Sequence, residues 1–115
     1  MSVVVYHNPR CSKSRETLQL LQAQGVEPEV VEYLKTPPSK ERLKQLLKML
    51  GLEPRELMRQ QEPEYEALGL DDPALSREQL VEAMVAHPKL IERPIVVKGD
   101  KAAIGRPPQQ VLEII

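Results

Sequence analysis

An α/β fold with one four-stranded mixed sheet is what this sequence predicts, and three observations support it. The first is a β-branched run at 2–6 (SVVVY), followed by a helical pattern and a second apolar run at 29–34 (EVVEYL). The second is a pair of short strands expected around Gly99-Asp100, which is a strong hairpin signal. The third is a series of amphipathic helical patterns between these two parts, which predicts helices rather than strands there.

The first part of the chain indicates a β-α-β unit. The run at 2–6 is typical of a buried strand, and the run at 29–34 predicts a second strand. A helix is expected from Cys11 onward, because the pattern there turns helical, with Leu18, Leu20, Leu21 and Ala23 apolar, and Gly25 is a typical residue to end a helix. Two strands joined by a helix are usually parallel, with a right-handed crossover.

The middle of the chain, from about 38 to 87, predicts an all-helical insert. Four leucines between 43 and 50 recur at i, i+3, i+4 and i+7, so they share one face of a helix. Gly51 follows as the expected helix end. Further helices are expected where prolines or a capping box precede apolar residues, at 54–59, 63–68 and 76–87.

The last part of the chain indicates a β-β-α unit. Strands at 94–97 and 101–104 flank Gly99-Asp100, which is a strong hairpin signal, and Pro107-Pro108 opens a final helix. A β-α-β unit and a β-β-α unit around one sheet make the thioredoxin-like arrangement. We therefore expect a single thioredoxin-like domain over 1–115 that contains the helical insert.

Composition excludes several classes of function. With 16 Lys and Arg against 17 Asp and Glu, the net charge is −1, which argues against binding nucleic acid or an anionic membrane. No apolar run has the length of a membrane span, and the first residues lack a signal-peptide pattern, so we expect a cytoplasmic protein. One cysteine and two histidines exclude a disulfide framework and a Cys/His zinc site, and no bound metal is expected.

The only thiol, Cys11, lies where the first strand gives way to the first helix. A thiol at a helix start faces unpaired backbone N–H groups and the positive end of the helix dipole, which favour the thiolate. Arg10, Lys13 and Arg15 add positive charge, and Ser14 is expected to donate a hydrogen bond to the sulfur. The alternative is a buried, inert cysteine, but the cationic surroundings favour a reactive thiol in a loop suited to an oxyanion.

The segment at 6–18 (YHNPRCSKSRETL) resembles the active-site segment of the glutaredoxin-dependent, ArsC-type arsenate reductases. The likeness continues in order through five further motifs, at 33–38, 55–59, 65–70, 87–97 and 105–107. It therefore spans almost the whole chain. The resemblance implies a thioredoxin-like fold with a helical insert, in agreement with the order of elements deduced above.

The resemblance also implies catalytic roles for particular positions. Cys11 matches the nucleophile that attacks arsenate. Arg59, Arg93 and Arg106 match three arginines that hold the oxyanion and its covalent adduct with the cysteine. Arginine suits this task because its planar fork binds two oxygens of an oxyanion at once. Read singly, each of these arginines could instead be an ordinary solvated charge.

Other positions near the cysteine complete the expected site. Asn8 and Ser12 belong to the same loop and are expected to contact the substrate. His7 is expected to hydrogen-bond the loop, with tuning of the Cys11 thiolate as the alternative. The resemblance further implies a cis peptide bond before Pro94.

The cysteine count bears on the reaction scheme, because a chain with one thiol needs a second thiol from outside. We expect glutathione as the co-substrate and glutaredoxin as the partner, with no bound cofactor and a monomeric protein. Two alternatives stay open: a general glutathione-linked thiol oxidoreductase, and a redox-responsive regulator of the Spx type that binds RNA polymerase. Regulators of that type commonly carry a second cysteine where this chain has Ser14, and they lack the Asn8-Pro9 lead into the first.

Overall fold

The computed structural model describes residues 2–115, which form two compact units. The first unit contains the residues up to Thr36 together with Arg93–Ile115, and the second contains Pro37–Glu92. Each unit is described by itself below. That the whole chain makes one domain with an insert stays a prediction.

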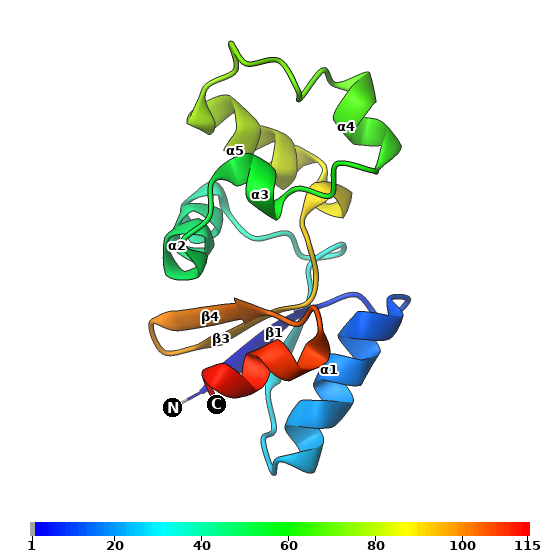
Figure 1. Cartoon of the computed structure of the whole chain (residues 1–115), viewed down its shortest axis with the longest axis vertical. Helices are drawn as coiled ribbons and strands as arrows, with labels where there is room; N and C mark the ends of the chain where they lie inside the picture. Colours follow the sequence, from blue (N-terminus) through cyan, green and yellow to red (C-terminus); the bar gives the residue numbers. More distant parts are fainter. Residues whose placement is uncertain (1) are drawn as a thin grey trace. The chain divides into compact units, whose positions relative to one another are not determined.

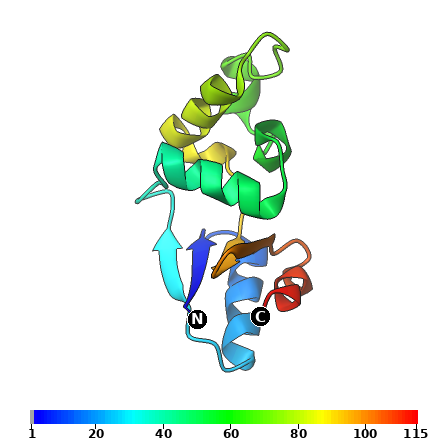
Figure 2. The same cartoon turned by 90° about the vertical axis from the view of Figure 1, so that its left-hand side faces the viewer.

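A four-stranded sheet forms the centre of the first unit. Its strands are β1 (Val3–His7), β2 (Glu29–Glu32), β3 (Ile95–Lys98) and β4 (Lys101–Ile104), in the order β2-β1-β3-β4. β1 and β2 are parallel, as Figure 2 shows, whereas the β1–β3 and β3–β4 pairs are antiparallel. The predicted mixed sheet is confirmed, including the tight β3–β4 hairpin.

Two helices pack together in the first unit, α1 (Ser12–Ala23) and η2 (Pro108–Glu113), drawn in blue and red in Figure 1. Both contribute to one apolar cluster with the sheet, built around Val3, Val5, Leu21, Val96 and Val111. The prediction of a final α-helix is wrong, because η2 is a 3₁₀-helix. Six residues behind two prolines form too few i→i+4 hydrogen bonds to sustain an α-helix.

The second unit is built from helices (Figure 1). They are α2 (Lys40–Leu50), α3 (Pro54–Leu57), α4 (Pro63–Ala67), α5 (Arg77–Ala86) and the 3₁₀-helix η1 (Pro88–Leu90). Their start and stop signals are those expected: Ser39 and Ser76 cap α2 and α5, and Gly51 ends α2 with a φ of 68°. Between residues 38 and 87 the elements are helices, as predicted, and Met58 also forms an isolated antiparallel bridge with Ile91, which lies beyond the predicted insert.

The core of the second unit is aliphatic, as the lack of Trp and Phe requires. α5 packs against α2, α3 and η1. The side chains that these elements bury are Leu43, Leu46, Leu47, Leu57, Leu80, Val81, Met84 and Leu90. No helix within residues 2–115 is both long enough and apolar enough to cross a membrane.

The register of the sheet brings three loops to one edge. Tyr6 pairs with Ile95, and Ile95 pairs with Ile104. The end of β1, the start of β3 and the end of β4 therefore lie side by side. The segments attached there are the Cys11 loop after β1, residues 93–94 before β3 and residues 105–106 after β4.

Candidate active site

Cys11 is the residue that caps the start of α1. Its backbone is extended, with φ −94° and ψ 124°, and its side chain is 8% exposed. Its N–H donates to the Asn8 carbonyl at 3.0 Å, and its own carbonyl accepts from the Arg15 N–H at 3.0 Å. No acidic residue lies in the first helical turn. The sulfur thus lies at the positive end of the α1 dipole without a local carboxylate to offset it.

Asn8 shapes the loop that carries the thiol. Its side-chain Oδ1 accepts from the Arg10 N–H at 3.0 Å, and its carbonyl accepts from Cys11. A third hydrogen bond in the loop comes from Arg15, whose Nη1 donates to the Pro9 carbonyl at 3.0 Å. These bonds give Asn8 a structural role beside its predicted contact with substrate. Ser12, the other loop residue predicted to bind substrate, is exposed at the start of α1.

Ser14 does not make the predicted hydrogen bond to the Cys11 sulfur. Its buried Oγ accepts from the Asn8 N–H at 3.0 Å and lies 2.7 Å from Nδ1 of His7. The physical reason is the burial of the imidazole, which needs a polar partner at Nδ1, and the serine hydroxyl supplies one. His7 therefore does not bond the loop directly: it contacts Ser14 of α1, and Ser14 in turn accepts from the Asn8 N–H of the loop.

The charge state of His7 follows from its surroundings. Burial lowers the pKa of His7, the Glu32 carboxylate opposes this shift, and the charge of Arg15 reinforces it. The imidazole is therefore neutral at neutral pH. Nδ1 of His7 faces the Ser14 hydroxyl. It accepts a hydrogen bond from the hydroxyl when Nε2 carries the proton and donates one when Nδ1 carries it.

Arg106 links the Cys11 loop to the segment before β3. Its Nη2 donates to the Cys11 Sγ at 3.4 Å, and its Nε donates to the Arg93 carbonyl at 2.8 Å. This contact places the positive charge of a guanidinium beside the sulfur. The peptide bond between Arg93 and Pro94 is cis, as expected, and the bond between Arg106 and Pro107 is also cis.

Arg59 belongs to the second unit, where it follows α3. Its N–H donates to the Leu90 carbonyl at 2.7 Å. Its guanidinium pairs with the carboxylates of Glu62 and Glu92, the latter at 3.7 Å from Nε. The structure thus places the Arg106 guanidinium against Cys11 and holds it through the Arg93 carbonyl, while places for the Arg93 and Arg59 guanidinium groups at the substrate stay predictions.

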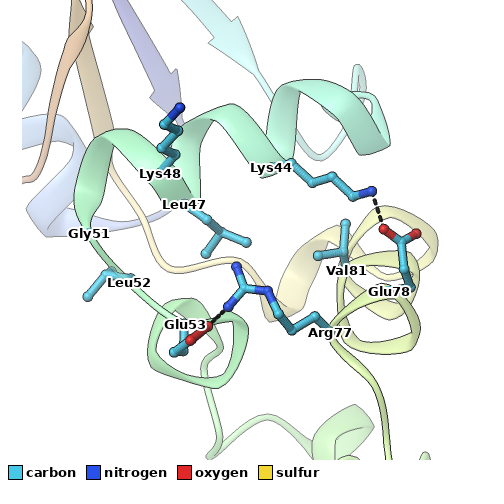
Figure 3. Close-up of a pocket in the computed structure, with 9 residues that line it drawn as sticks. All are labelled: Lys44, Leu47, Lys48, Gly51, Leu52, Glu53, Arg77, Glu78 and Val81. Atoms are coloured by element: carbon cyan, nitrogen blue, oxygen red, sulfur yellow. Dashed lines mark ion pairs between the residues drawn. The ribbon is translucent and has the colours of Figure 1, made fainter.

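The second unit has a pocket of its own, between α2, α5 and the loop before α3 (Figure 3). Apolar side chains of Leu47, Leu52 and Val81 line it, and the pairs Lys44–Glu78 and Arg77–Glu53 lie around it. None of the predicted site residues is among those that line this pocket.

Two contributions to the site were missed from the sequence. One is the Arg93 carbonyl, which accepts a hydrogen bond from Nε of Arg106. The other is the Ser14 hydroxyl, which hydrogen-bonds His7. A backbone carbonyl is common to every residue type, so no sequence signal distinguishes it. The Ser14–His7 contact depends on which face of α1 is buried, and this face could have been estimated from the helical pattern.

Comparison with known proteins relates the whole chain to one family. The model of the ArsC family matches residues 6–114. An arsenate reductase of Haemophilus influenzae is 50% identical over 116 residues, covering 100% of both chains. The Escherichia coli K12 protein named "Uncharacterized protein YfgD" is 63% identical over 114 residues, covering 98% of this chain and 96% of that protein.

A solved structure extends the comparison to the fold. An arsenate reductase from Vibrio cholerae superposes with a TM-score of 0.98 at 59% identity, covering 100% of this chain and 98% of that one. The matched family segment contains every residue predicted for the site, from His7 to Arg106.

Proposed function

Because the chain belongs to the ArsC family, we propose that it is an arsenate reductase that converts arsenate to arsenite through Cys11. The observation that carries the proposal is the contact between the Arg106 guanidinium and the Cys11 sulfur, at the start of a helix. This arrangement places the thiol and a cation at one point. The named activities of the Haemophilus and Vibrio relatives support arsenate as the substrate.

The oxyanion is bound by the same groups that stabilise the thiolate. Arsenate carries about two negative charges near neutral pH, and guanidinium groups bind such charges through paired N–H donors. The Arg106 guanidinium contacts the Cys11 sulfur, and Arg93, whose carbonyl accepts from Nε of Arg106, is proposed as the second ligand. Arg59 is proposed as the third ligand, which requires that the oxyanion compete with its carboxylate partners Glu62 and Glu92.

The reaction begins with attack of the Cys11 thiolate on arsenic. A sulfur–arsenic bond forms and an arsenic–oxygen bond breaks, with the oxygen leaving as water after it takes up a proton. The arginines offset the charge of the adduct, as an oxyanion hole does. Arsenic stays in the +5 state in this step, so no electrons have yet been transferred.

Reduction needs a second thiol, and we propose glutathione because Cys11 is the only cysteine. The glutathione thiolate attacks the Cys11 sulfur, a sulfur–sulfur bond forms, and the sulfur–arsenic electron pair remains on arsenic. Arsenite leaves, and the two thiols together have supplied two electrons. Glutaredoxin then removes glutathione from Cys11 by thiol–disulfide exchange and regenerates the thiol.

This scheme requires no resident cofactor, and we propose that the protein works as a monomer. We expect the reaction to take place in the cytoplasm, because glutathione keeps thiols reduced there.

A coupled assay tests the proposed function. Purified protein is incubated with arsenate, glutathione, glutaredoxin and a glutathione-recycling system, and arsenite is measured directly. We expect repeated turnover to arsenite only when all components are present, and no arsenite with Cys11→Ser, since a serine hydroxyl stays protonated. Reduction of a model disulfide without any arsenite would instead favour the general thiol oxidoreductase.

A further inference from the structure

Gly105 is buried between two rigid neighbours in the first unit. Its N–H donates to the Pro94 carbonyl at 2.9 Å. A Cβ atom at this position would lie 2.8 Å from Cγ of Pro94 and 3.1 Å from Cγ2 of Thr17, and closer still to Oγ1 of Thr17. Real Cβ atoms essentially never lie as close to another atom as the 2.8 Å to Pro94, so any side chain at 105 would force a movement.

Neither neighbour can readily make room. Thr17 is fully buried in α1, and its Oγ1 donates to the Lys13 carbonyl at 2.8 Å. The Pro94 ring is closed, buried and fixed at the start of β3. The segment that would have to move is therefore residue 105 itself, away from α1.

The need for glycine at this position comes from close approach and not from backbone conformation. Four glycines of the chain have a positive φ, at positions 25, 51, 69 and 99, and Gly105 is not among them. Gly25 shows the contrast, because it has a φ of 77° but no atom within 4 Å of a Cβ placed there. The neighbouring atoms alone therefore exclude a side chain at position 105.

The next residue, Arg106, depends on this close approach. Its guanidinium donates to Cys11 Sγ at 3.4 Å and to the Arg93 carbonyl at 2.8 Å. Hydrogen bonds weaken steeply as they lengthen and bend, so a shift of a few tenths of an ångström at residue 105 would loosen both. We propose that Gly105 is a positioning residue, whose missing side chain lets the end of β4 lie against α1 so that Arg106 reaches Cys11. The inference rests on the proposed function, in which Arg106 serves the Cys11 thiolate.

A double-mutant cycle between Gly105→Ala and Arg106→Ala tests this role. We expect Gly105→Ala to lower kcat/KM for arsenate by about tenfold in the wild-type background and by less than about twofold when Arg106 is already alanine. An equal loss in both backgrounds, or no loss in either, would overturn the proposal, because the effect would then not pass through Arg106.

A second readout needs no turnover. The rate of Cys11 alkylation by iodoacetamide is measured at about pH 6 and about pH 9, and their ratio reports ionisation of the thiol independently of access. We expect Gly105→Ala to lower this ratio as Arg106→Ala does, with no further decrease in the double variant. If wild-type protein produces no arsenite, the proposed function fails, while this ratio still decides the role of Gly105.

Two further variants control for folding. Gly25→Ala makes the same chemical change in the same unit, and we expect a small decrease in Tm with an unchanged alkylation ratio. Thr17→Ala removes both threonine atoms that the new Cβ would meet, so Thr17→Ala/Gly105→Ala should recover part of the loss. If Gly105→Ala alone does not fold, the cycle with Arg106→Ala is run in the Thr17→Ala background, with the same criteria.

Discussion

Nη2 of Arg106 lies 3.4 Å from the Cys11 sulfur, although the two residues are 95 positions apart in the sequence. The same guanidinium donates through Nε to the Arg93 carbonyl at 2.8 Å. The bond to the Arg93 carbonyl therefore fixes the guanidinium in the position from which Nη2 donates to the thiol sulfur. This double attachment determines what each substitution at the sheet edge should do.

Replacing Arg106 by alanine should lower kcat/KM for arsenate by about tenfold or more, since a charge-assisted bond to the reacting sulfur is lost. Arg106→Lys should restore only part of the activity, because one ammonium cannot reproduce the fork that donates to Cys11 and Arg93. Steady-state kinetics with Arg42→Ala as the control measures this. Full activity of Arg106→Ala would exclude it from the site.

Ser14→Ala should release the Asn8 amide, because the serine Oγ is the acceptor of that N–H. A buried hydrogen bond of this kind contributes about 1 kcal/mol. We expect amide exchange at Asn8 to become much faster in the variant, as measured by hydrogen exchange, and activity to fall without being abolished. Thr17→Ala, on the same helix, is the control. Unchanged exchange at Asn8 would contradict the assigned partner.

Removing His7 should change how stability depends on pH. Burial lowers the pKa of His7 below its ordinary 6.5, so below that pH the unfolded chain binds a proton that the folded chain does not. Wild-type stability should therefore decline as pH falls from about 7 through this window. His7→Asn should show a shallower decline in urea titrations, and parallel curves for the two proteins would count against a neutral His7.

Glu62→Gln tests the proposed place of Arg59. Glu62 pairs with the Arg59 guanidinium, so a bound oxyanion has to compete with this carboxylate. Removing the carboxylate charge should lower the KM for arsenate several-fold if Arg59 binds the substrate. The same substitution in an Arg59→Ala background should leave KM unchanged. An unaltered KM in both backgrounds would remove Arg59 from the site.

The helices α2 and α5 are joined by a charge cluster, in which Lys40 pairs with Glu78 and Glu82, and Lys44 pairs with Glu78. Hydrogen bonds to the two carboxylates raise the pKa of Lys40 to about 12, and those from the two lysines lower the pKa of Glu78. Glu78 contributes to the free energy of unfolding at pH values above its ordinary pKa, and this contribution is lost as pH falls through the lowered pKa. Lys40 contributes to the free energy of unfolding at pH values below its ordinary pKa, and this contribution is lost as pH rises through the raised pKa of about 12.

Glu78→Gln should therefore lower Tm slightly at neutral pH, and the difference from wild type should vanish in acid and shrink in high salt. Thermal unfolding followed by circular dichroism measures it, with the exposed Glu66→Gln as the control. A difference that persists in acid would show that the effect is not electrostatic.

Much of the fold follows from local patterns in the sequence. The β-branched run at 2–6 predicts β1, the leucines at helical spacing predict α2, and Gly99-Asp100 predicts the β3–β4 hairpin. The 3₁₀ form of η2 escaped prediction, since apolar spacing over six residues does not separate it from an α-helix. For the site, Cys11 at the helix start was predictable, because a strand-to-helix junction has one geometry.

Other features of the site depend on contacts that no local pattern encodes. The acceptor of Nε in Arg106 is a backbone carbonyl, and the partner of Ser14 is decided by the burial of His7. The restriction at Gly105 arises from Thr17 and Pro94, which are distant in sequence and meet only after folding.

The most direct test of the central claim is the intact mass of the protein after a single turnover. Protein is mixed with arsenate and glutathione in the absence of glutaredoxin, and both arsenite and protein mass are measured. We predict one arsenite per chain and one glutathione attached to Cys11 through a disulfide, with neither product from Cys11→Ser. Arsenite formed with Cys11 unmodified, or formed equally by Cys11→Ser, would contradict the covalent mechanism.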